Sequence, residues 1–223
     1  MINFALFLIL STIFFILFLI DQFFQNLKNR KLDLRREVIP KAIFLYCEIK
    51  IHYHKLLDKF RLMFLLIEKS NVLMEMYKTR KLRILFLYYD NPMTVKNIDD
   101  CRSCYGIALE SNFINNEIRD LAKEVNLNSE AELEDISIIF SPTKYNGKLS
   151  VIYGFMSIIP SLYKNCRIKG FKIDFRIMGL YITNDNMNFF VPSFQENEKI
   201  KSYLNIMKSY PPPEKIQQSK TKN

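Results

Sequence analysis

Residues 82–92 read Leu-Arg-Ile-Leu-Phe-Leu-Tyr-Tyr-Asp-Asn-Pro and lie at the centre of the predicted fold of this 223-residue chain. The apolar and aromatic run Leu82–Tyr89 is typical of a β-strand. Asp90-Asn91-Pro92 then ends the strand, because Asp and Asn favour turns and Pro has no backbone N–H to donate. A sheet is therefore expected, and the segments on either side indicate how it is built.

These segments predict alternating strands and helices. Runs rich in β-forming residues predict the remaining strands at Ile43–Ile51, Arg102–Leu109, Ile136–Phe140, Leu149–Tyr153, Phe175–Thr183 and Met187–Val191, the last two as a hairpin around Asn184-Asp185-Asn186. Helical spacing and capping signals predict helices from Lys55 to about Tyr77, over Asn115–Val125 with Asn as a cap, and over Phe155–Arg167 with Pro160 near its start. This order predicts an α+β domain of two β-α-β-β-type halves, with helices on one face of the sheet.

The N-terminus predicts a transmembrane anchor over residues 1–20. Ile2–Ile20 contains nineteen residues without a charge, and a helix of that length spans roughly 28 Å, close to the hydrocarbon thickness of a bilayer. A cleaved signal peptide, the alternative, needs a basic start and a small-residue cleavage site. No Lys or Arg precedes the apolar run, and Asp21-Gln22-Phe23-Phe24 follows it.

A basic connector over residues 21–40 follows the anchor and suggests its direction. Its basic residues are Lys28, Arg30, Lys31, Arg35 and Arg36. Because positive charge beside a span tends to stay in the cytosol, the domain predicted over residues 41–210 is expected to face the cytosol. The alternatives are a solvated linker, which leaves the direction open, and contact with anionic lipid. The tail over residues 211–223 has no aromatic residue and is predicted to be disordered.

Composition narrows the possible partners. The net charge of +9 is compatible with nucleic acid as a partner, but it is spread along the chain and partly sits beside the anchor, so nucleic-acid binding is not expected. Four cysteines are too few for a disulfide scaffold and are compatible with reduced thiols, although an even number also allows two bridges.

The block Tyr88-Tyr89-Asp90-Asn91-Pro92, followed by Cys101-Arg102 and Gly106, resembles the testis-expressed protein 264 family. The resemblance extends over roughly residues 40–195 and includes the N-terminal span, Ile159-Pro160 and Phe190-Val191-Pro192. It implies a gyrase-inhibitor-like domain, related to the SOUL haem-binding fold. It also implies a single-pass protein of the endoplasmic-reticulum membrane that acts as a non-enzymatic ER-phagy receptor. The partners it implies are ubiquitin-like autophagy modifiers and a AAA+ segregase.

The family's modifier-binding motif has one candidate here, Tyr203-Leu204-Asn205-Ile206. In an extended conformation, Tyr203 and Ile206 would fill two pockets while the backbone adds a strand to the modifier's sheet. The chain departs from the family pattern because it lacks a long acidic tail, and lysines flank the motif. The alternative is a short helix that packs Tyr203 and Ile206 onto the domain.

Other residues suggest possible sites of different kinds. Tyr88, Tyr89 and Asp90 are candidates for a cleft between the halves, which would bind a small hydrophobic, haem-like ligand. Asp90 is also the one candidate for an acid–base role, as a hydrolase on this fold would need, and its alternative is to cap the local turn. His52 and His54 are conceivable haem ligands, and Cys101-Arg102-Ser103-Cys104 has the spacing of half a zinc site or a redox pair. Structural thiols, exposed histidines and core aromatics are the alternatives. No nucleophile–base pair or phosphate loop is apparent, so neither catalysis, a metal nor a cofactor is expected.

Overall fold

The computed structural model describes residues 12, 14–15, 32–50, 57–90, 94–144, 148–173, 177–183, 186–193, 199–207 and 209–214. The predicted anchor lies outside the described residues except for Thr12, Phe14 and Phe15, which are helical. Within the described parts of the chain, no helix has the length and apolar character needed to cross a bilayer. His52, His54, the Asn91-Pro92 turn and most of the predicted tail also lie outside them.

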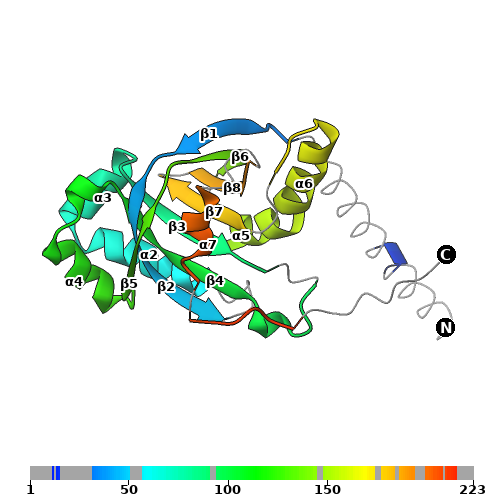
Figure 1. The fold of residues 1–223 in the computed structure, drawn as a ribbon. Coiled ribbons are helices and arrows are strands. Elements are labelled where there is room, and N and C mark those ends of the chain that lie inside the picture. The colour runs from blue at the N-terminus through cyan, green and yellow to red at the C-terminus, as the bar shows by residue number, and fades with distance from the viewer. Residues whose placement is uncertain are drawn as a thin grey trace.

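One antiparallel sheet forms the centre of the domain (Figure 1). Across the sheet, the strands of the described chain follow the order β1-β6-β8-β7-β3-β4-β2-β5. Their bounds are β1 Arg35–Ile39, β2 Ala42–Lys50, β3 Leu82–Tyr88, β4 Arg102–Leu109, β5 Ser129–Leu133, β6 Ile136–Lys144, β7 Met178–Thr183 and β8 Asn186–Pro192. The strands predicted around residues 43–51, 82–89 and 102–109 and in the final hairpin are thus confirmed.

The helices pack around this sheet. Their bounds are α2 Leu57–Glu68, α3 Asn71–Lys78, α4 Asn116–Glu124, α5 Lys148–Tyr153, α6 Ile159–Ile168 and α7 Ile200–Leu204. Asn115 caps α4 as predicted, since its side chain accepts a hydrogen bond from the Ile118 N–H at 2.9 Å. The long helix predicted from Lys55 is instead two helices, because Ser70 leaves the helical conformation and caps α3.

The strand order contains two similar halves. In the first half, β4 lies between β2 and β3, and in the second, β8 lies between β6 and β7. Helices α2 and α3 follow β2, and α5 and α6 follow β6, while β3 and β7 pair where the halves meet. The predicted β-α-β-β organisation is therefore present in the described chain, and the α+β class is confirmed.

Each half also has a leading strand that belongs to the sheet edge of the other half. β1 precedes β2 in sequence but pairs with β6, and β5 precedes β6 but pairs with β2. Neither strand was predicted. The prediction that residues 21–40 form only a connector is wrong for β1, which is aligned over five positions with β6, and the folded part reaches back to the buried Leu32.

The predicted strand at Leu149–Tyr153 is also wrong, because these residues lie in α5. A π-helical turn over Gly154–Ile158 joins α5 to α6, and Pro160 sits in the first turn of α6. Short apolar runs do not distinguish a strand from a buried helix by periodicity alone. Here Val151 is buried against the sheet as part of a longer helical stretch.

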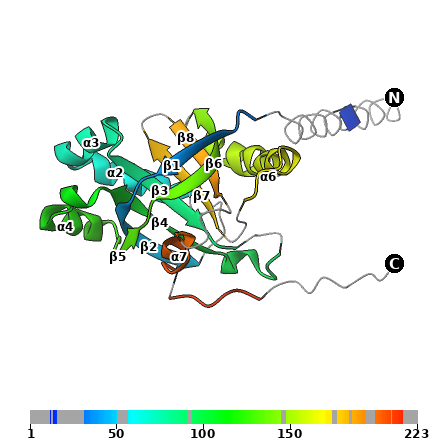
Figure 2. The same cartoon turned by 45° about the horizontal axis from the view of Figure 1, so that its top comes forward.

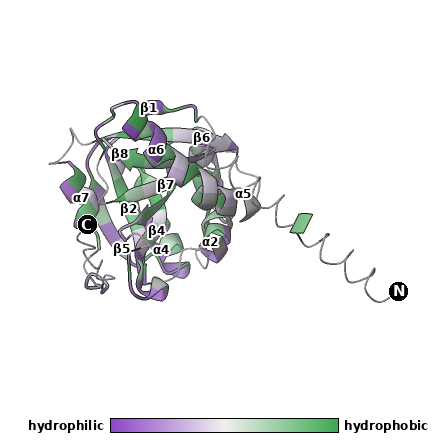
Figure 3. Ribbon diagram, turned by 90° about the vertical axis from the view of Figure 1, so that its right-hand side faces the viewer, coloured by the Kyte–Doolittle hydropathy of each residue, from purple (hydrophilic) through white to green (hydrophobic). Residues whose placement is uncertain are grey.

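Both faces of the sheet are buried. Alternate residues of β3 separate onto the two faces: Ile84 and Phe86 pack under the helices α2–α6, while Leu85 and Leu87 belong to a second cluster. The inner strands carry mostly hydrophobic residues, whereas the helices mix both kinds (Figure 3). Residues 200–207 complete the second cluster, and Figure 2 shows α7 beside β2. Helices α2–α6 thus cover one face and α7 covers the other, so the prediction that helices lie on one face only is wrong for α7.

Candidate functional site at the covered face of the sheet

The C-terminal segment, residues 199–207 and 209–210, lies against the sheet face opposite α2–α6. This face, under α7, is called the covered face. Tyr203 and Ile206 are each only 1% exposed and pack with Phe44 and Leu85. Tyr203 lies in α7 and Ile206 in the turn after it, so the predicted extended motif is not the arrangement found here. The alternative, a short helix packed on the domain, is what the structure has. The physical reason is the spacing of Ile200, Tyr203 and Ile206, which places three large apolar side chains on one side of the segment.

Polar contacts fix the segment at its backbone. The Tyr89 hydroxyl donates to the Tyr203 carbonyl at 2.9 Å, and the Tyr46 hydroxyl donates to the Ile206 carbonyl at 3.4 Å. The Tyr203 hydroxyl in turn donates to the Glu134 carbonyl at 3.1 Å. Tyrosines from the sheet thus satisfy carbonyls at and just beyond the end of a short helix, which intrahelical bonds leave open.

The predicted cleft residues do not share one face. Tyr88 points toward the helices and its ring meets Phe155 edge-on, with 5.1 Å between the ring centroids. Tyr89 reaches the covered face and binds Tyr203, as described above. Burial raises the pKa of both tyrosine hydroxyls well above the usual value, which keeps both neutral. The prediction of a cleft lined by Tyr88, Tyr89 and Asp90 is therefore corrected: Tyr88 packs under the helices, whereas Tyr89 contacts the C-terminal segment.

The Asp90 carboxylate forms an ion pair with Arg102. The carboxylate accepts from the Arg102 backbone N–H at 2.8 Å and from the guanidinium Nε and a terminal nitrogen at 2.9 Å each. The Asp90 side chain is 7% exposed and that of Arg102 is 16% exposed. This two-point pair holds the end of β3 to the start of β4.

Replacing Asp90 by Asn is expected to lower the free energy of unfolding by about 2–3 kcal/mol, because it leaves a nearly buried guanidinium without its counter-charge. Urea unfolding measures this loss. The matched control is Asp120→Asn, since Asp120 forms an exposed pair with Lys123 at 2.9 Å, and such a pair contributes about 0.5 kcal/mol or less. Equal effects of the two variants would contradict a structural role for Asp90.

Cys101 and Cys104 do not come together as half a zinc site or a redox pair. Cys101 packs in the cluster under the helices and Cys104 in the cluster on the covered face, so the sheet separates the two thiols. Burial, helped by the Asp90 charge, raises the pKa of the Cys101 thiol to about 11, and burial raises the pKa of Cys104 further. All four cysteines are free thiols. Within the described ranges, no group of three or more His, Cys, Asp or Glu side chains is placed to hold a metal ion.

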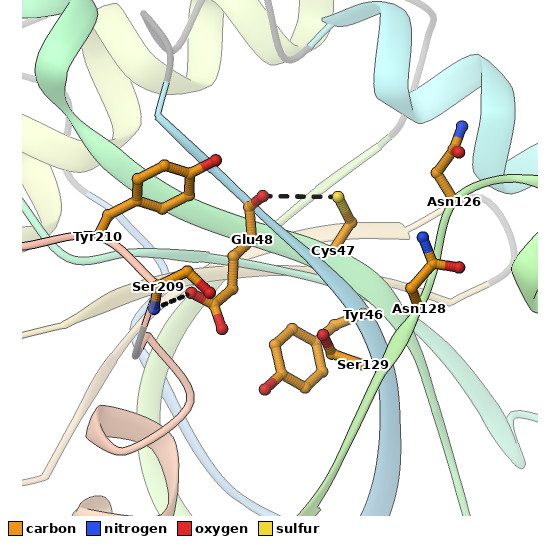
Figure 4. A pocket seen from close by; sticks show the side chains of 8 residues that line it. All are labelled: Tyr46, Cys47, Glu48, Asn126, Asn128, Ser129, Ser209 and Tyr210. Atoms are coloured by element: carbon orange, nitrogen blue, oxygen red, sulfur yellow. Dashed lines mark hydrogen bonds between the residues drawn. The ribbon is translucent and has the colours of Figure 1, made fainter.

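A polar cavity of about 200 Å³ lies beside the C-terminal segment (Figure 4). It is lined by Tyr46, Cys47, Glu48, Asn126, Asn128, Ser129, Ser209 and Tyr210. Glu48 Oε2 accepts from the Ser209 N–H at 2.8 Å, so one wall of the cavity is the segment itself. Figure 4 shows Asn126 and Asn128 on the opposite side from Ser209 and Tyr210. The sequence did not predict this cavity. A local signal is Asn126, which follows the C-cap Val125 of α4 and has a positive φ of 66°.

Comparisons with known proteins give similarities of fold at low identity. No protein-family model matches the sequence, and no curated protein matches it either. Among solved structures, the chain is similar to a hydrolase from Listeria innocua, with 15% identity, 74% of this chain and 93% of that one covered, and a TM-score of 0.43. It is also similar to a putative transcription regulation protein from Staphylococcus aureus MU50, with 6% identity, 73% and 99% coverage, and a TM-score of 0.45. A third is SAV2435 bound to tetraphenylphosphonium, with 8% identity, 75% and 98% coverage, and a TM-score of 0.43. These similarities carry no information on activity, ligand or partner.

Proposed function

We propose that this protein is a membrane-tethered, non-enzymatic adaptor whose folded domain presents a surface to protein partners. Residues 1–20 anchor it in the endoplasmic-reticulum membrane with the domain in the cytosol. The order of the two halves fits the gyrase-inhibitor-like, SOUL-like arrangement that the resemblance to the testis-expressed protein 264 family implies. The same resemblance supports ER-phagy as the process, with ubiquitin-like autophagy modifiers and a AAA+ segregase as partners.

The observation that carries this proposal is the occupied face of the sheet. A membrane-tethered module for a small hydrophobic, haem-like ligand, the alternative function, needs an open apolar cleft. In this protein Tyr203, Ile206 and Met207 fill that face and are at most 9% exposed. A ligand would have to displace the protein's own side chains, which favours the adaptor over the ligand-binding module.

Because Tyr203 and Ile206 are buried, the segment that carries them must detach from the domain before it can bind a modifier. Exposing a fully buried apolar side chain costs about 1.5–3 kcal/mol, so releasing two costs on the order of 3–6 kcal/mol. An affinity that depends on the released segment is lowered by about two to four orders of magnitude. The intact chain is therefore expected to bind modifiers weakly through this motif.

The test titrates the full chain, reconstituted in nanodiscs, against a panel of autophagy modifiers and against haem in parallel. The double variant Tyr46→Phe, Tyr89→Phe removes the two hydroxyls that hold the segment's carbonyls while keeping both rings. Because each of the two bonds contributes about 1 kcal/mol, the variant is expected to bind a modifier about 30-fold more tightly than the unmodified chain.

Tyr181→Phe is the matched control, because its hydroxyl donates to Glu37 of β1 at 2.8 Å and not to a carbonyl of the segment. It should leave modifier binding unchanged. If no modifier binds either the chain or the double variant, the autophagy part of the proposal is wrong. A stoichiometric change in the haem absorption spectrum would favour the ligand-binding module instead.

A further inference from the structure

The end of α6 carries an exposed basic and apolar patch. Ile168, the last residue of α6, is 73% exposed, which is the largest exposure of any large hydrophobic residue in the described chain. Exposed basic residues surround it along the helix and the following turn: Lys164, Arg167, Lys169 and Lys172. These residues together are the α6 tip. A large aliphatic side chain ringed by cations is the composition that anionic lipid surfaces attract.

The turn that carries part of the α6 tip contacts the strand that follows the anchor. The guanidinium of Arg36 on β1 lies 4.6 Å from the centre of the Phe171 ring, which belongs to the turn after α6. The N-terminal end of β1 lies beside α6 in two views (Figures 1 and 2). Two acidic residues lie on or near this strand. Asp33 pairs with Arg35 at 2.7 Å, and Glu37 accepts from Tyr181. Neither contact involves a residue of the α6 tip.

Chain length brings this patch within reach of a bilayer. Twelve residue steps separate Ile20, the end of the predicted anchor, from Leu32, the start of the folded part. Even fully extended they span only about 40 Å. β1 cannot swing away from the domain, because it is aligned with β6 over its whole length. A tether at residue 20 therefore keeps the α6 tip within reach of the headgroups.

We propose that the α6 tip is a docking surface for anionic phospholipid headgroups, with Ile168 entering the interface and the basic residues contacting lipid phosphates. The inference rests on the membrane tether of the proposed function. Docking there orients the domain, so that the end carrying α3 points away from the membrane. Helices α3 and α6 lie at opposite ends of the domain in both views (Figures 1 and 2).

The experiment reconstitutes the full chain in vesicles with an environment-sensitive fluorophore on Ile168→Cys. A lipid-attached quencher reports contact in vesicles of phosphatidylcholine alone or with phosphatidylserine. Quenching is expected to require phosphatidylserine and to weaken in 0.5 M salt. The variant Arg167→Glu, Lys169→Glu, Lys172→Glu is expected to lower the docking constant at least tenfold, because each basic residue near an anionic surface contributes to attraction.

Val72→Cys supplies the matched control, since Val72 lies on α3 and is 54% exposed. Its label should show no dependence on lipid charge. The chain without an added cysteine, taken through the same labelling, gives the background from the half-buried Cys47.

Three results overturn the inference. If quenching at position 168 depends on neither lipid charge nor salt, the α6 tip is not a docking surface for anionic lipid. If the chain still floats with the vesicles, the membrane tether of the proposed function stands. If the chain floats with neither kind of vesicle, it is not tethered to the membrane, and the docking inference fails together with the tether. A label at 168 that responds to a short RNA in solution as strongly as to phosphatidylserine assigns the patch to nucleic acid.

Discussion

Replacing Tyr203 by Ala is expected to lower the free energy of unfolding by about 3–5 kcal/mol, the range for deleting a large aromatic side chain from a core. Tyr203 is 1% exposed, and its removal leaves a cavity between α7 and the sheet. The substitution also removes the hydroxyl that donates to the Glu134 carbonyl at 3.1 Å. Since domains are commonly stable by only about 5–15 kcal/mol, this one change should shift the urea midpoint strongly.

Tyr203→Phe separates packing from hydrogen bonding. It keeps the ring and loses the bond to Glu134, so a loss of only about 1 kcal/mol is expected. A loss below 1 kcal/mol for Tyr203→Ala would mean that the segment is not packed as described. The expected loss has a practical consequence. A Tyr203→Ala, Ile206→Ala chain that fails to bind a modifier says nothing about the motif unless its fold has been checked.

Replacing Gly106 by Ala is expected to lower the free energy of unfolding by about 3 kcal/mol or more, at or beyond the top of the usual range for overpacking. A methyl group at this position would lie 1.9 Å from the Leu45 carbonyl oxygen and 2.8 Å from the Tyr46 Cα. These are backbone atoms of β2, and Gly106 sits opposite Tyr46 in the β2–β4 pairing. Because β4 is hydrogen-bonded on both sides, neither strand can move without disturbing the next.

Gly170→Ala is the comparison for this prediction. Nothing lies within 4 Å of a methyl group there, but the residue has φ +69°. The expected loss is therefore only the cost of a left-handed conformation, about 1 kcal/mol. Urea unfolding of both variants measures the difference. Similar losses at the two positions would contradict the close approach of β2 and β4.

The strands and helix that were predicted well are those with a local signal. The β2–β4 strands are apolar runs bounded by turns, and α4 has both its apolar spacing and its Asn115 cap. β1 and β5 have no such signal, because they are charged edge strands whose residues are mostly exposed or half-exposed. They form because β6 and β2, far away in the sequence, supply hydrogen-bond partners. The residues next to β1 or β5 in the sequence give no sign of these distant partners.

The site was predictable in part. Tyr88 and Tyr89 are adjacent in an extended segment, so strand alternation alone places them on opposite faces. The near-continuous apolar run of β3 is typical of burial on both sides, a signal that the prediction of helices on one face did not use; α7 supplies the second covering layer. The identity of that layer was not predictable, because it depends on which distant segment returns to the sheet. The polar cavity beside Ser209 depends on the same return.

The exchange of leading strands between the halves has a consequence for biosynthesis. The leading strand of each half pairs with a strand of the other half. β1 has no pairing partner until β6 has been synthesised, and β5, which leads the second half, pairs with β2 of the first half. About 100 residues separate β1 from β6, which at ordinary elongation rates is a delay of roughly 5–20 s. During that interval the nascent first half presents unpaired backbone to the ribosome surface and to chaperones. Fragments that each carry one half should therefore aggregate when expressed separately and recover solubility when produced together.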